Sequence, residues 1–303
     1  MGTPEFAVPS LEILHHHHYP ILAVVTAPDK PRGRGQAVLP TAVKRFAVSS
    51  GLTILQPVSM KDPTFVQTLE RLRPDLIVVV AFRILPQELF SIARLGAFNL
   101  HASLLPKYRG AAPINRAVMN GETETGVTTF MLQAKVDTGG ILLQEKIGIQ
   151  PDDDAGVLHD RLASVGARVV LQTVRYIEQG TVVPVAQDDS RATSAPKIQK
   201  EDCRIRWDQH AVGIHNMVRG LSPYPGAFTI HNGSILKLYR TSVLDIPLKG
   251  MPGEVFVSTT GLRVATSDRM VSIIEVQQEG KRRMGVEEFL RGYQISTGDM
   301  LTG

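Results

Sequence analysis

The chain has 303 residues, of which 43% are hydrophobic and 20% charged, so a disordered or collagen-like protein is excluded and a substantial core can be buried. Its 33 basic and 29 acidic residues leave a formal net charge of +4, which by itself does not indicate a nucleic-acid binder. The sequence contains neither a run of about 18 apolar residues nor a secretory signal, and its one cysteine, Cys203, cannot form an internal disulfide. We therefore expect a soluble, cytoplasmic protein with no membrane partner.

Residues 1–185 alternate between short apolar runs and helix-like segments. The run Leu-Ile-Val-Val-Val-Ala at 76–81 is apolar at every position, as in a strand covered on both faces of a parallel sheet. This alternation predicts an α/β domain with a doubly wound, mostly parallel Rossmann-like sheet. The expected strands are 21–26, 76–81 and 97–101, and the expected helices are 4–14, 41–50, 63–72, 86–93 and 155–179.

The start of the chain departs from this pattern. The first helix begins at about residue 4, which leaves no room for the central strand that normally opens such a sheet. Either the fold begins with a helix, or Met1 is an internal methionine of a longer reading frame. We expect the second, with the first strand missing.

Beyond residue 185 the pattern changes. Residues 186–200 are polar, lack an apolar period and contain Pro196, so we predict a linker between domains 1–185 and 201–303. After a helix-like stretch at 208–219, short alternating runs separated by Gly, Asn, Pro and Ser predict a small antiparallel, OB-like β-barrel. The expected strands of this second domain are 227–230, 235–239, 253–257, 262–265 and 270–275.

The segment from Asn99 to Ile114 carries the strongest chemical signal. On a strand, residues i and i+2 face the same side, so Asn99 and His101 project together at the carboxyl end of an apolar strand, where open α/β sheets build their sites. An amide beside an imidazole can hold an acyl oxygen and stabilise an oxyanion. Alternatively, Asn99 and His101 simply satisfy backbone groups of the loop that follows.

A second polar segment supports the first interpretation. Asp137 stands in the Gly-rich turn Val-Asp-Thr-Gly-Gly after an expected strand at 128–132, and it could return to the same sheet edge as His101. A carboxylate there would provide a base for a departing proton, directly or through water. The alternative is a local Asx-type turn.

A long loop at 27–40 concentrates positive charge. Between residues 29 and 45, five basic residues stand against one acid, and basic side chains on such a loop suit a phosphate backbone. The alternative is a solvated charged loop. The basic residues are Lys30, Arg32, Arg34, Lys44 and Arg45.

Metal and dinucleotide motifs are missing from the sequence. Gly33-x-Gly35 lacks a third glycine, and no zinc-type cysteine pair or His-Glu-x-x-His occurs, so we expect no metal. The run His15–His18 is expected in a solvated loop, because four consecutive side chains point in different directions.

Together these motifs closely resemble the methionyl-tRNA formyltransferases, within the 10-formyltetrahydrofolate-dependent transformylases. The resemblance extends over nearly the whole chain and keeps the family order. It rests on Gly-Thr-Pro-Glu-Phe-Ala at 2–7, Pro-Asp-Lys-Pro and Gly-Arg-Gly in the basic loop, Asn-x-His-x-Ser-Leu-Leu-Pro at 99–106, Tyr-Arg-Gly-Ala-Ala-Pro-Ile at 108–114, Asp-Thr-Gly at 137–139 and Ser-Pro-Tyr-Pro-Gly-Ala at 222–227.

The resemblance implies formyl transfer from 10-formyltetrahydrofolate to the α-amino group of methionyl initiator tRNA, for translation initiation, by a metal-independent monomer. It implies that the catalytic residues are Asn99, His101 and Asp137, and that the folate site is lined by Ser103, Leu104, Leu105 and Pro106. It also implies that Arg34 lies in a tRNA-binding loop, to which we add Lys30 and Arg32. Arg83 departs from the family, since many members have a glycine at that point of a loop that is one residue longer.

Two other functions are compatible with part of these features. A transformylase with a small amine acceptor, such as a sugar nucleotide, would keep the three catalytic residues without needing the basic loop. A non-enzymatic RNA-binding protein on an inactive transformylase scaffold would not need Asn99, His101 and Asp137 together.

Overall fold

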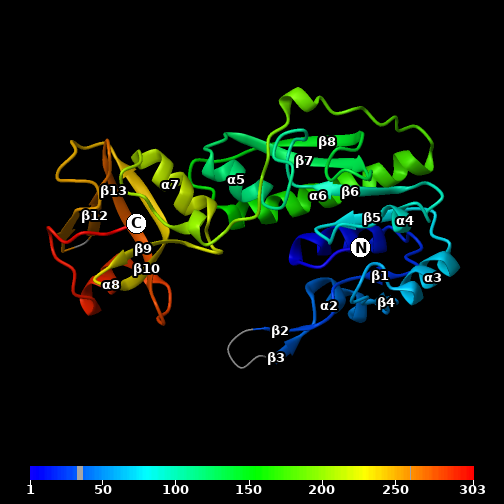
Figure 1. The fold of residues 1–303 in the computed structure, drawn as a ribbon, viewed down its shortest axis with the longest axis horizontal. Coiled ribbons are helices and arrows are strands. Elements are labelled where there is room, and N and C mark those ends of the chain that lie inside the picture. The colour runs from blue at the N-terminus through cyan, green and yellow to red at the C-terminus, as the bar shows by residue number, and fades with distance from the viewer. Residues whose placement is uncertain (33–36, 260) are drawn as a thin grey trace. The chain divides into compact units, whose positions relative to one another are not determined.

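The computed structural model describes residues 1–32, 37–259 and 261–303 (Figure 1). Its chain forms two compact units, each described here by itself. Unit 1 comprises residues 1–110, 125–147 and 159–194, and unit 2 comprises residues 111–124, 148–158 and 195–303. Among the described residues no helix combines the length and the apolar character that crossing a membrane would require.

Apart from the hairpin β2–β3 described below, the described strands of unit 1 form two sheets. In the first, β1 (Val24–Val25) pairs in parallel with β4 (Ile54–Leu55). The second has the order β5-β6-β7-β8, in which β5 and β6 are parallel but β6 and β7 are antiparallel. This sheet is therefore mixed, in contrast to the mostly parallel arrangement that we predicted. Its strands are β5 (Ile77–Val80), β6 (Ala97–His101), β7 (Glu124–Met131) and β8 (Ile141–Gly148).

The helices of unit 1 begin where the sequence offers caps. Thr41 accepts a hydrogen bond from the backbone N–H of Lys44, and Asp62 accepts one from Thr64, which fixes the starts of α2 and α3. The predicted solvated loop at His15–His18 is wrong in part, because α1 continues through the first two of these histidines. The helices are η1 (Glu5–Ala7), α1 (Val8–His16), α2 (Ala42–Ser49), α3 (Pro63–Leu72), α4 (Gln87–Phe90) and α6 (Ala155–Glu178).

Met1 and Gly2 connect the two sheets. The Met1 amine donates to the Val78 carbonyl at 2.6 Å, and the Val80 N–H donates back to the Met1 carbonyl at 2.9 Å. On the other side, the Gly2 N–H donates to Val25 at 3.0 Å. The first two residues thus occupy one strand position between β1 and β5, in the direction of a parallel ladder.

The basic segment contains a β-hairpin that the sequence did not predict. β2 (Lys30–Arg32) pairs antiparallel with β3 (Ala37–Leu39), and Figure 1 shows this hairpin extending away from the sheets of unit 1. Arg34 lies outside the described residues.

Unit 2 packs helices against an antiparallel sheet. The pairing order is β11-β12-β13-β10-β9, with β14 beside β13, and this order does not close. The predicted β-rich domain is therefore present, whereas the described strand pairings do not form a closed barrel. The elements are α5 (Pro113–Met119), α7 (Ala211–Gly220), α8 (Val286–Gly292), β9 (Ala227–His231), β10 (Ser234–Leu244), β11 (Val255–Ser258), β12 (Gly261–Ala265), β13 (Met270–Gln278) and β14 (Met284–Gly285). Two short 3-10 helices precede α7 in the sequence, Asp189–Arg191 in unit 1 and Glu201–Cys203 in unit 2.

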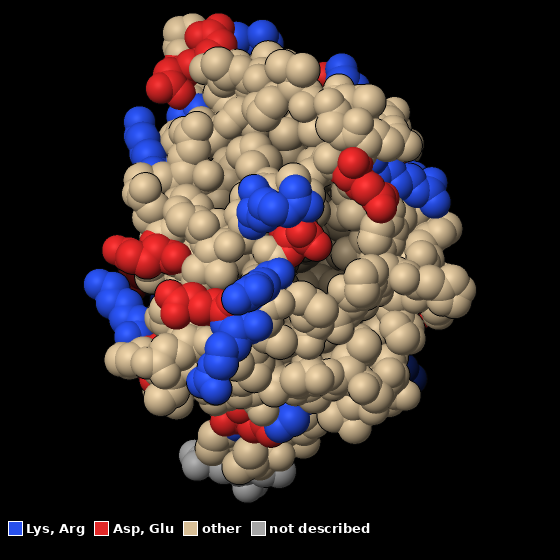
Figure 2. Space-filling model, turned by 90° about the vertical axis from the view of Figure 1, so that its right-hand side faces the viewer, with Lys and Arg blue, Asp and Glu red and all other residues tan. Residues whose placement is uncertain are grey.

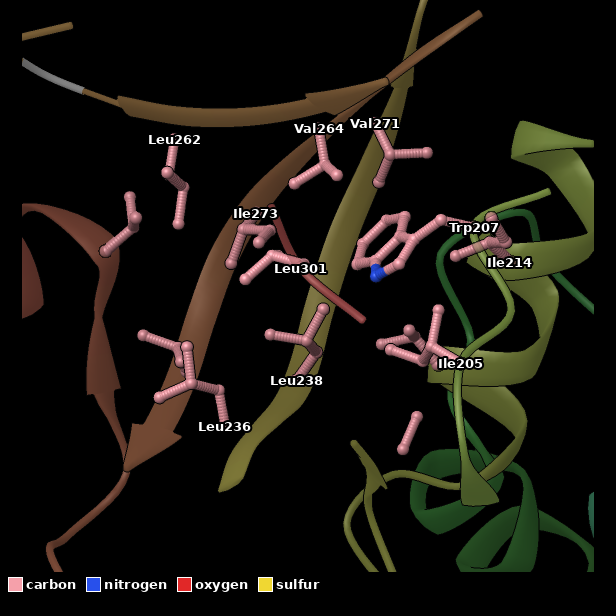
Figure 3. Packing of buried hydrophobic residues seen from close by; sticks show 14 of the residues in the cluster. Ile205, Trp207, Ile214, Leu236, Leu238, Leu262, Val264, Val271, Ile273 and Leu301 are labelled. Carbon is pink, nitrogen blue, oxygen red and sulfur yellow. The ribbon is translucent and has the colours of Figure 1, made fainter. Parts of the chain in front are cut away.

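The core of unit 2 lies between this sheet and α7. Figure 3 shows Leu238 and Ile273 on neighbouring strands facing Ile205 and Ile214, with Trp207 between them. These side chains are almost fully buried, and the indole N–H of Trp207 donates to Thr229 at 3.0 Å, so its polar group is satisfied. Alternating inward-facing positions on β10 and β13 account for the runs that the sequence analysis identified.

The buried amine of Met1 predicts an unusual pH dependence. Burial lowers the pKa of this amine from 8.0 to about 5. Between these values the unfolded chain binds the extra proton, so the free energy of unfolding increases as the pH is raised from 5 to 8, by at most roughly 4 kcal/mol. The nearby titratable groups Tyr19, Asp75, Arg94 and Glu178 line the same cavity and are common to both forms compared below.

Urea unfolding of the chain beginning at Met1 would be measured from pH 5.5 to 8.5, with the free and with the acetylated amine. Acetylation keeps an N–H donor but removes the charge, so the acetylated form should be more stable at pH 6 and lose this slope. Equal slopes in the two forms would contradict the prediction.

Candidate active site

Strand β6 positions the two polar residues that the sequence analysis identified. It pairs with β5 through Val79 and with β7 through Phe130, so Asn99 is held on a central strand. His101 follows two residues later and faces the same side. His101 is 6% exposed, whereas Asn99 is half-buried, and no hydrogen bond of the Asn99 side chain to the described residues is found. Its amide is therefore available to a ligand.

The ring of His101 is oriented by the backbone. Its Nε2 lies 2.8 Å from the carbonyl oxygen of Tyr108, which can only accept, so Nε2 carries the proton of this hydrogen bond. The ring also meets Phe130 edge to face at a centroid distance of 6.5 Å. The alternative interpretation, in which the imidazole satisfies a loop backbone group, is thus correct for Nε2. Nδ1 is therefore the ring nitrogen that is able to contact a ligand.

Asp137 comes to the same place. Its Oδ2 lies 4.0 Å from Nδ1 of His101, too long for a hydrogen bond but within ion-pair distance. The same oxygen accepts a hydrogen bond from the backbone N–H of Gly110 at 2.9 Å, and this partner is distant in sequence, in contrast to the partner of a local Asx turn. The turn is tight: Asp137 has φ +55°, and a Cβ at Gly139 would lie 1.6 Å from the Met131 carbonyl oxygen.

The turn that follows His101 is held by two residues that the sequence analysis missed. The Thr128 hydroxyl donates to the Ser103 carbonyl at 2.6 Å, and the Gln144 amide donates to the Leu105 carbonyl at 2.8 Å. The side chains of Ser103 and Leu105 are buried, and the Ser103 hydroxyl donates to the Lys107 carbonyl. Of the four predicted folate-site residues, only Leu104 and Pro106 therefore have partly exposed side chains.

Part of the predicted linker lies against this turn. The Arg109 N–H donates to the Thr193 carbonyl at 2.9 Å, and the Thr193 hydroxyl accepts the Tyr108 N–H at 2.8 Å. Farther upstream, Val185 and Ile141 exchange backbone hydrogen bonds. Residues 185–194 thus form a strap that completes the backbone hydrogen bonding of the site loops. We use the term strap for these residues below.

Gln187 of the strap connects the two site loops. Its amide nitrogen donates to the carbonyl oxygens of Asp137 at 2.9 Å and Gly139 at 2.8 Å. Its amide oxygen accepts from Arg109 at 2.7 and 3.1 Å. Arg109 also pairs with Asp189 at 2.6 Å, and this hydrogen bond holds the pKa of the Asp189 carboxyl below its usual value. The Asp137 turn is therefore positioned through Gln187.

Arg83 ties the loop after β5 to a neighbouring loop. Its guanidinium donates to the carbonyl oxygens of Pro57 at 2.7 Å and Val58 at 2.8 Å, and it lies 5.3 Å from the centroid of the Phe82 ring. A glycine at this position would provide neither contact. The departure from the family pattern thus supplies a cross-link at the end of β5, next to the strand that carries Asn99.

The positive charge of the basic segment is partly neutralised. The Asp29 carboxylate accepts hydrogen bonds from Lys44 at 2.5 Å and from Gln56 at 2.8 Å, and the bond from Lys44 is the main cause that lowers the pKa of this carboxyl. The guanidinium of Arg45 lies 3.6 Å from the carboxylate of Glu5. In the β2–β3 hairpin Lys30 is exposed, whereas only the backbone of Arg32 is described.

Two family models match the chain. The model "Formyl transferase" matches residues 1–174, and "Formyl transferase, C-terminal domain" matches residues 197–294. A solved N-formyltransferase from Helicobacter canadensis, in complex with folinic acid and dTDP-3-aminofucose, is 20% identical with a TM-score of 0.68, covering 90% of this chain and 96% of that one. At this identity the likeness shows the fold alone. The two family models define the chain as a formyl transferase.

Curated relatives specify the family. A methionyl-tRNA formyltransferase from Caldanaerobacter subterraneus subsp. tengcongensis is 47% identical, over 99% of this chain and 98% of its own length. Another from Syntrophus aciditrophicus is 48% identical, over 99% and 97% respectively. The chain belongs to the methionyl-tRNA formyltransferases.

The contacts of Gln187 generate a prediction for catalysis. Gln187→Glu keeps the acceptor for Arg109 but replaces the donor to the Asp137 and Gly139 carbonyls by a second acceptor. Losing two such hydrogen bonds should lower kcat by about tenfold or more while leaving KM for tRNA nearly unchanged. Steady-state formylation kinetics would measure both constants.

Gln172→Glu is the matched control, because the Gln172 amide donates to the Tyr176 hydroxyl on the surface of α6. This variant should retain the parent kcat. Equal kcat values for Gln187→Glu and Gln172→Glu would exclude a positioning role for Gln187.

Proposed function

We propose that Asn99, His101 and Asp137 are the catalytic residues with which this enzyme transfers a formyl group from 10-formyltetrahydrofolate to the α-amino group of methionyl initiator tRNA. The observation that carries the assignment is the convergence of three groups. The half-buried Asn99 lies on the same face of β6 as His101, and Nδ1 of His101 is 4.0 Å from Oδ2 of Asp137.

Asn99 and His101 act on the formyl oxygen. When the neutral amine attacks the formyl carbon, the carbonyl electrons move onto oxygen, and donors that are already in place lower the free energy of that charge. The Asn99 amide supplies one N–H donor. His101 in its protonated form supplies the second from Nδ1, because its Nε2–H is already bonded to Tyr108.

Asp137 accepts the proton that the attacking amine must lose, directly or through one water. The reference pKa of an α-amino group is about 8, so about one tenth of the amine at pH 7 and about half at pH 8 is neutral and able to attack. As the new C–N bond forms and the bond to the folate nitrogen breaks, the leaving nitrogen takes up one proton, so the number of protons is conserved. The Gly110 N–H keeps the carboxylate in position during this transfer.

The residues present suit a folate co-substrate. Formyl transferases use formyl-tetrahydrofolate, whose ring faces pack on apolar side chains and whose polar ring edges need hydrogen-bond partners. Phe82 after β5 and Leu104 and Pro106 after β6 offer partly exposed apolar side chains, and Asn99 offers an unpartnered amide. We assign Leu104, Pro106 and the backbone of Ser103–Leu105 to the folate site.

The β2–β3 hairpin and unit 2 are assigned to tRNA binding. Lys30, Arg32 and Arg34 would contact phosphates of the acceptor end, because ammonium and guanidinium groups on a projecting hairpin fit a phosphate backbone. We interpret unit 1 as a Rossmann-like domain and unit 2 as an OB-like domain, and we propose that the enzyme acts as a cytoplasmic monomer without a metal.

Substitutions at the three catalytic residues test the assignment. Asn99→Ala should lower kcat by about 10²- to 10³-fold, as expected for loss of one oxyanion donor. Asp137→Asn keeps an acceptor for the Gly110 N–H but removes the base, whereas Asp137→Ala removes both. Both Asp137 variants should lose most activity while retaining the parent melting temperature.

The assay uses labelled 10-formyltetrahydrofolate with charged initiator tRNA, and a dTDP-amino sugar as the second acceptor. Parent-like turnover by Asn99→Ala or Asp137→Asn would remove that residue from the mechanism. Formylation of the sugar alone would contradict the tRNA assignment.

Salt dependence tests the hairpin. Replacing Lys30, Arg32 and Arg34 by alanine should weaken tRNA binding and reduce the slope of log K against log salt by about one for each lost phosphate contact. Exchange of the exposed Lys61 and Arg71 for alanine in the same unit is the control and should leave the slope unchanged. Equal slopes for the two variants would exclude the hairpin from tRNA binding.

A further inference from the structure

One large aromatic side chain of unit 2 lies open to solvent. Tyr224 is 82% exposed, and it is the one exposed phenylalanine, tyrosine or tryptophan among the described residues. Its hydroxyl has no hydrogen-bond partner in that part of the chain. None of the catalytic, folate-site or hairpin residues assigned above belongs to its motif, Ser-Pro-Tyr-Pro-Gly-Ala at 222–227.

The loop that carries Tyr224 is held at both ends by hydrogen bonds. At its start the buried Ser222 hydroxyl donates to the Tyr239 carbonyl at 2.7 Å, and at its end the Gly226 N–H donates to the Leu221 carbonyl at 2.9 Å. Gly226 has φ +87°, and a Cβ there would lie 3.2 Å from the Tyr239 ring, so the loop needs glycine where it passes this ring. A proline on each side of Tyr224 fixes a further φ angle. The ring is therefore presented by a fixed backbone, and a ligand that contacts it would have to order little more than the side chain.

Cationic side chains border this loop. The Lys237 ammonium donates to the Pro225 carbonyl at 2.8 Å, and no carboxylate partner of this ammonium is found within the described ranges. The Arg283 guanidinium lies 4.6 Å from the centroid of the Tyr239 ring and pairs with Glu275. Because a carbonyl does not neutralise an ammonium, the charge of Lys237 favours an anionic ligand beside the loop.

A surface on which acidic and basic side chains are mixed offers RNA much less. Figure 2 shows such a surface at one end of unit 1, with both kinds of side chain intermixed around a hollow. Neighbouring opposite charges offset one another there, so a polyanion gains little net attraction. The Tyr224 loop instead combines an exposed ring with a neighbouring ammonium, which is the combination that binds single-stranded nucleic acid.

We propose that Tyr224 is a stacking residue for the tRNA substrate: an unpaired base lies on the Tyr224 ring, and a phosphate of the same strand lies beside the Lys237 ammonium. A tRNA has unpaired bases in its loops and at its 3′ end, and aromatic side chains on protein surfaces stack on such bases. Stacking adds affinity without involving charge, because every base has a π face. This role rests on the proposed binding of tRNA by unit 2, and the experiment below separates the two.

Substitutions of Tyr224 in the full chain test the stacking role. Tyr224→Leu keeps an apolar side chain but removes the π face, so the Kd for charged initiator tRNA should rise by about five- to a hundredfold. Tyr224→Phe retains the ring and should bind within about twofold of the parent chain. Met251→Ala is the matched control, because it removes another exposed apolar side chain of unit 2, and its Kd should equal that of the parent. The KM for 10-formyltetrahydrofolate and the melting temperature should be the same in all four chains.

Salt dependence and fluorescence separate stacking from charge. Lys237→Gln should reduce the slope of log K against log salt by about one, whereas Tyr224→Leu should leave this slope unchanged, because stacking releases no counterion. Initiator tRNAs that carry the fluorescent base 2-aminopurine at single unpaired positions report stacking directly. At one of these positions the parent chain and Tyr224→Phe should quench the fluorescence, and Tyr224→Leu should not.

Parent-like affinity of Tyr224→Leu together with a reduced salt slope of Lys237→Gln would overturn the stacking role while leaving unit 2 as a tRNA-binding unit. Parent-like affinity and slope for both variants would overturn the stacking role and the assignment of unit 2 together. An equal loss of affinity in Tyr224→Leu and Tyr224→Phe would show that the ring is not what binds, and would also overturn the stacking role.

Discussion

The backbone groups of a buried turn need hydrogen-bond partners, and this requirement determines which nitrogen of His101 is able to contact a ligand. The turn between β6 and α5 exposes the Tyr108 carbonyl to the imidazole, and Nε2 meets it at 2.8 Å. The ring is therefore oriented by a backbone group. Nδ1 faces Asp137, and the carboxylate, held by the Gly110 N–H, is available to accept a proton rather than being used to hold the ring.

The strap satisfies the same requirement for the rest of the site. The strap is polar and aperiodic in sequence, and it forms isolated backbone bridges to Ile141 of β8 and to Arg109 rather than a full strand ladder. Thr193 accepts and donates for the turn after β6, while Gln187 uses both ends of its amide to join the Asp137 turn to Arg109. A segment that the sequence analysis predicted as a linker is thus hydrogen-bonded to the loops of the candidate site.

The N-terminus bears on the site through the sheet. The site strand β6 pairs with β5, and Met1 and Gly2 join β5 to β1 through backbone hydrogen bonds. The Met1 amine is buried in making this connection.

Local patterns were sufficient for the elements with strong periodicity. The sequence predicted α3 at 63–72 and β6 at 97–101 with the observed bounds, because a capped amphipathic helix and a short apolar strand are set by neighbouring residues. The spacing of Asn99 and His101 placed both on one face for the same reason. The hairpin β2–β3 and the strand β8 were missed, since their pairing partners rather than their own periodicity make them strands.

The sequence by itself therefore determined the residue types and the family: the Asn-x-His pair, the Gly-rich turn with Asp137, and the conjunction of motifs along the chain. Tertiary structure alone decided that Nε2 of His101 meets the Tyr108 carbonyl while Nδ1 faces Asp137, that Gln187 and Thr193 bond to the loops around these residues, and that Met1 and Gly2 lie between β1 and β5. The reason is physical. Chain-local spacing fixes which side chains share a face, but hydrogen bonds between residues some 50 to 85 positions apart depend on how distant segments pack together.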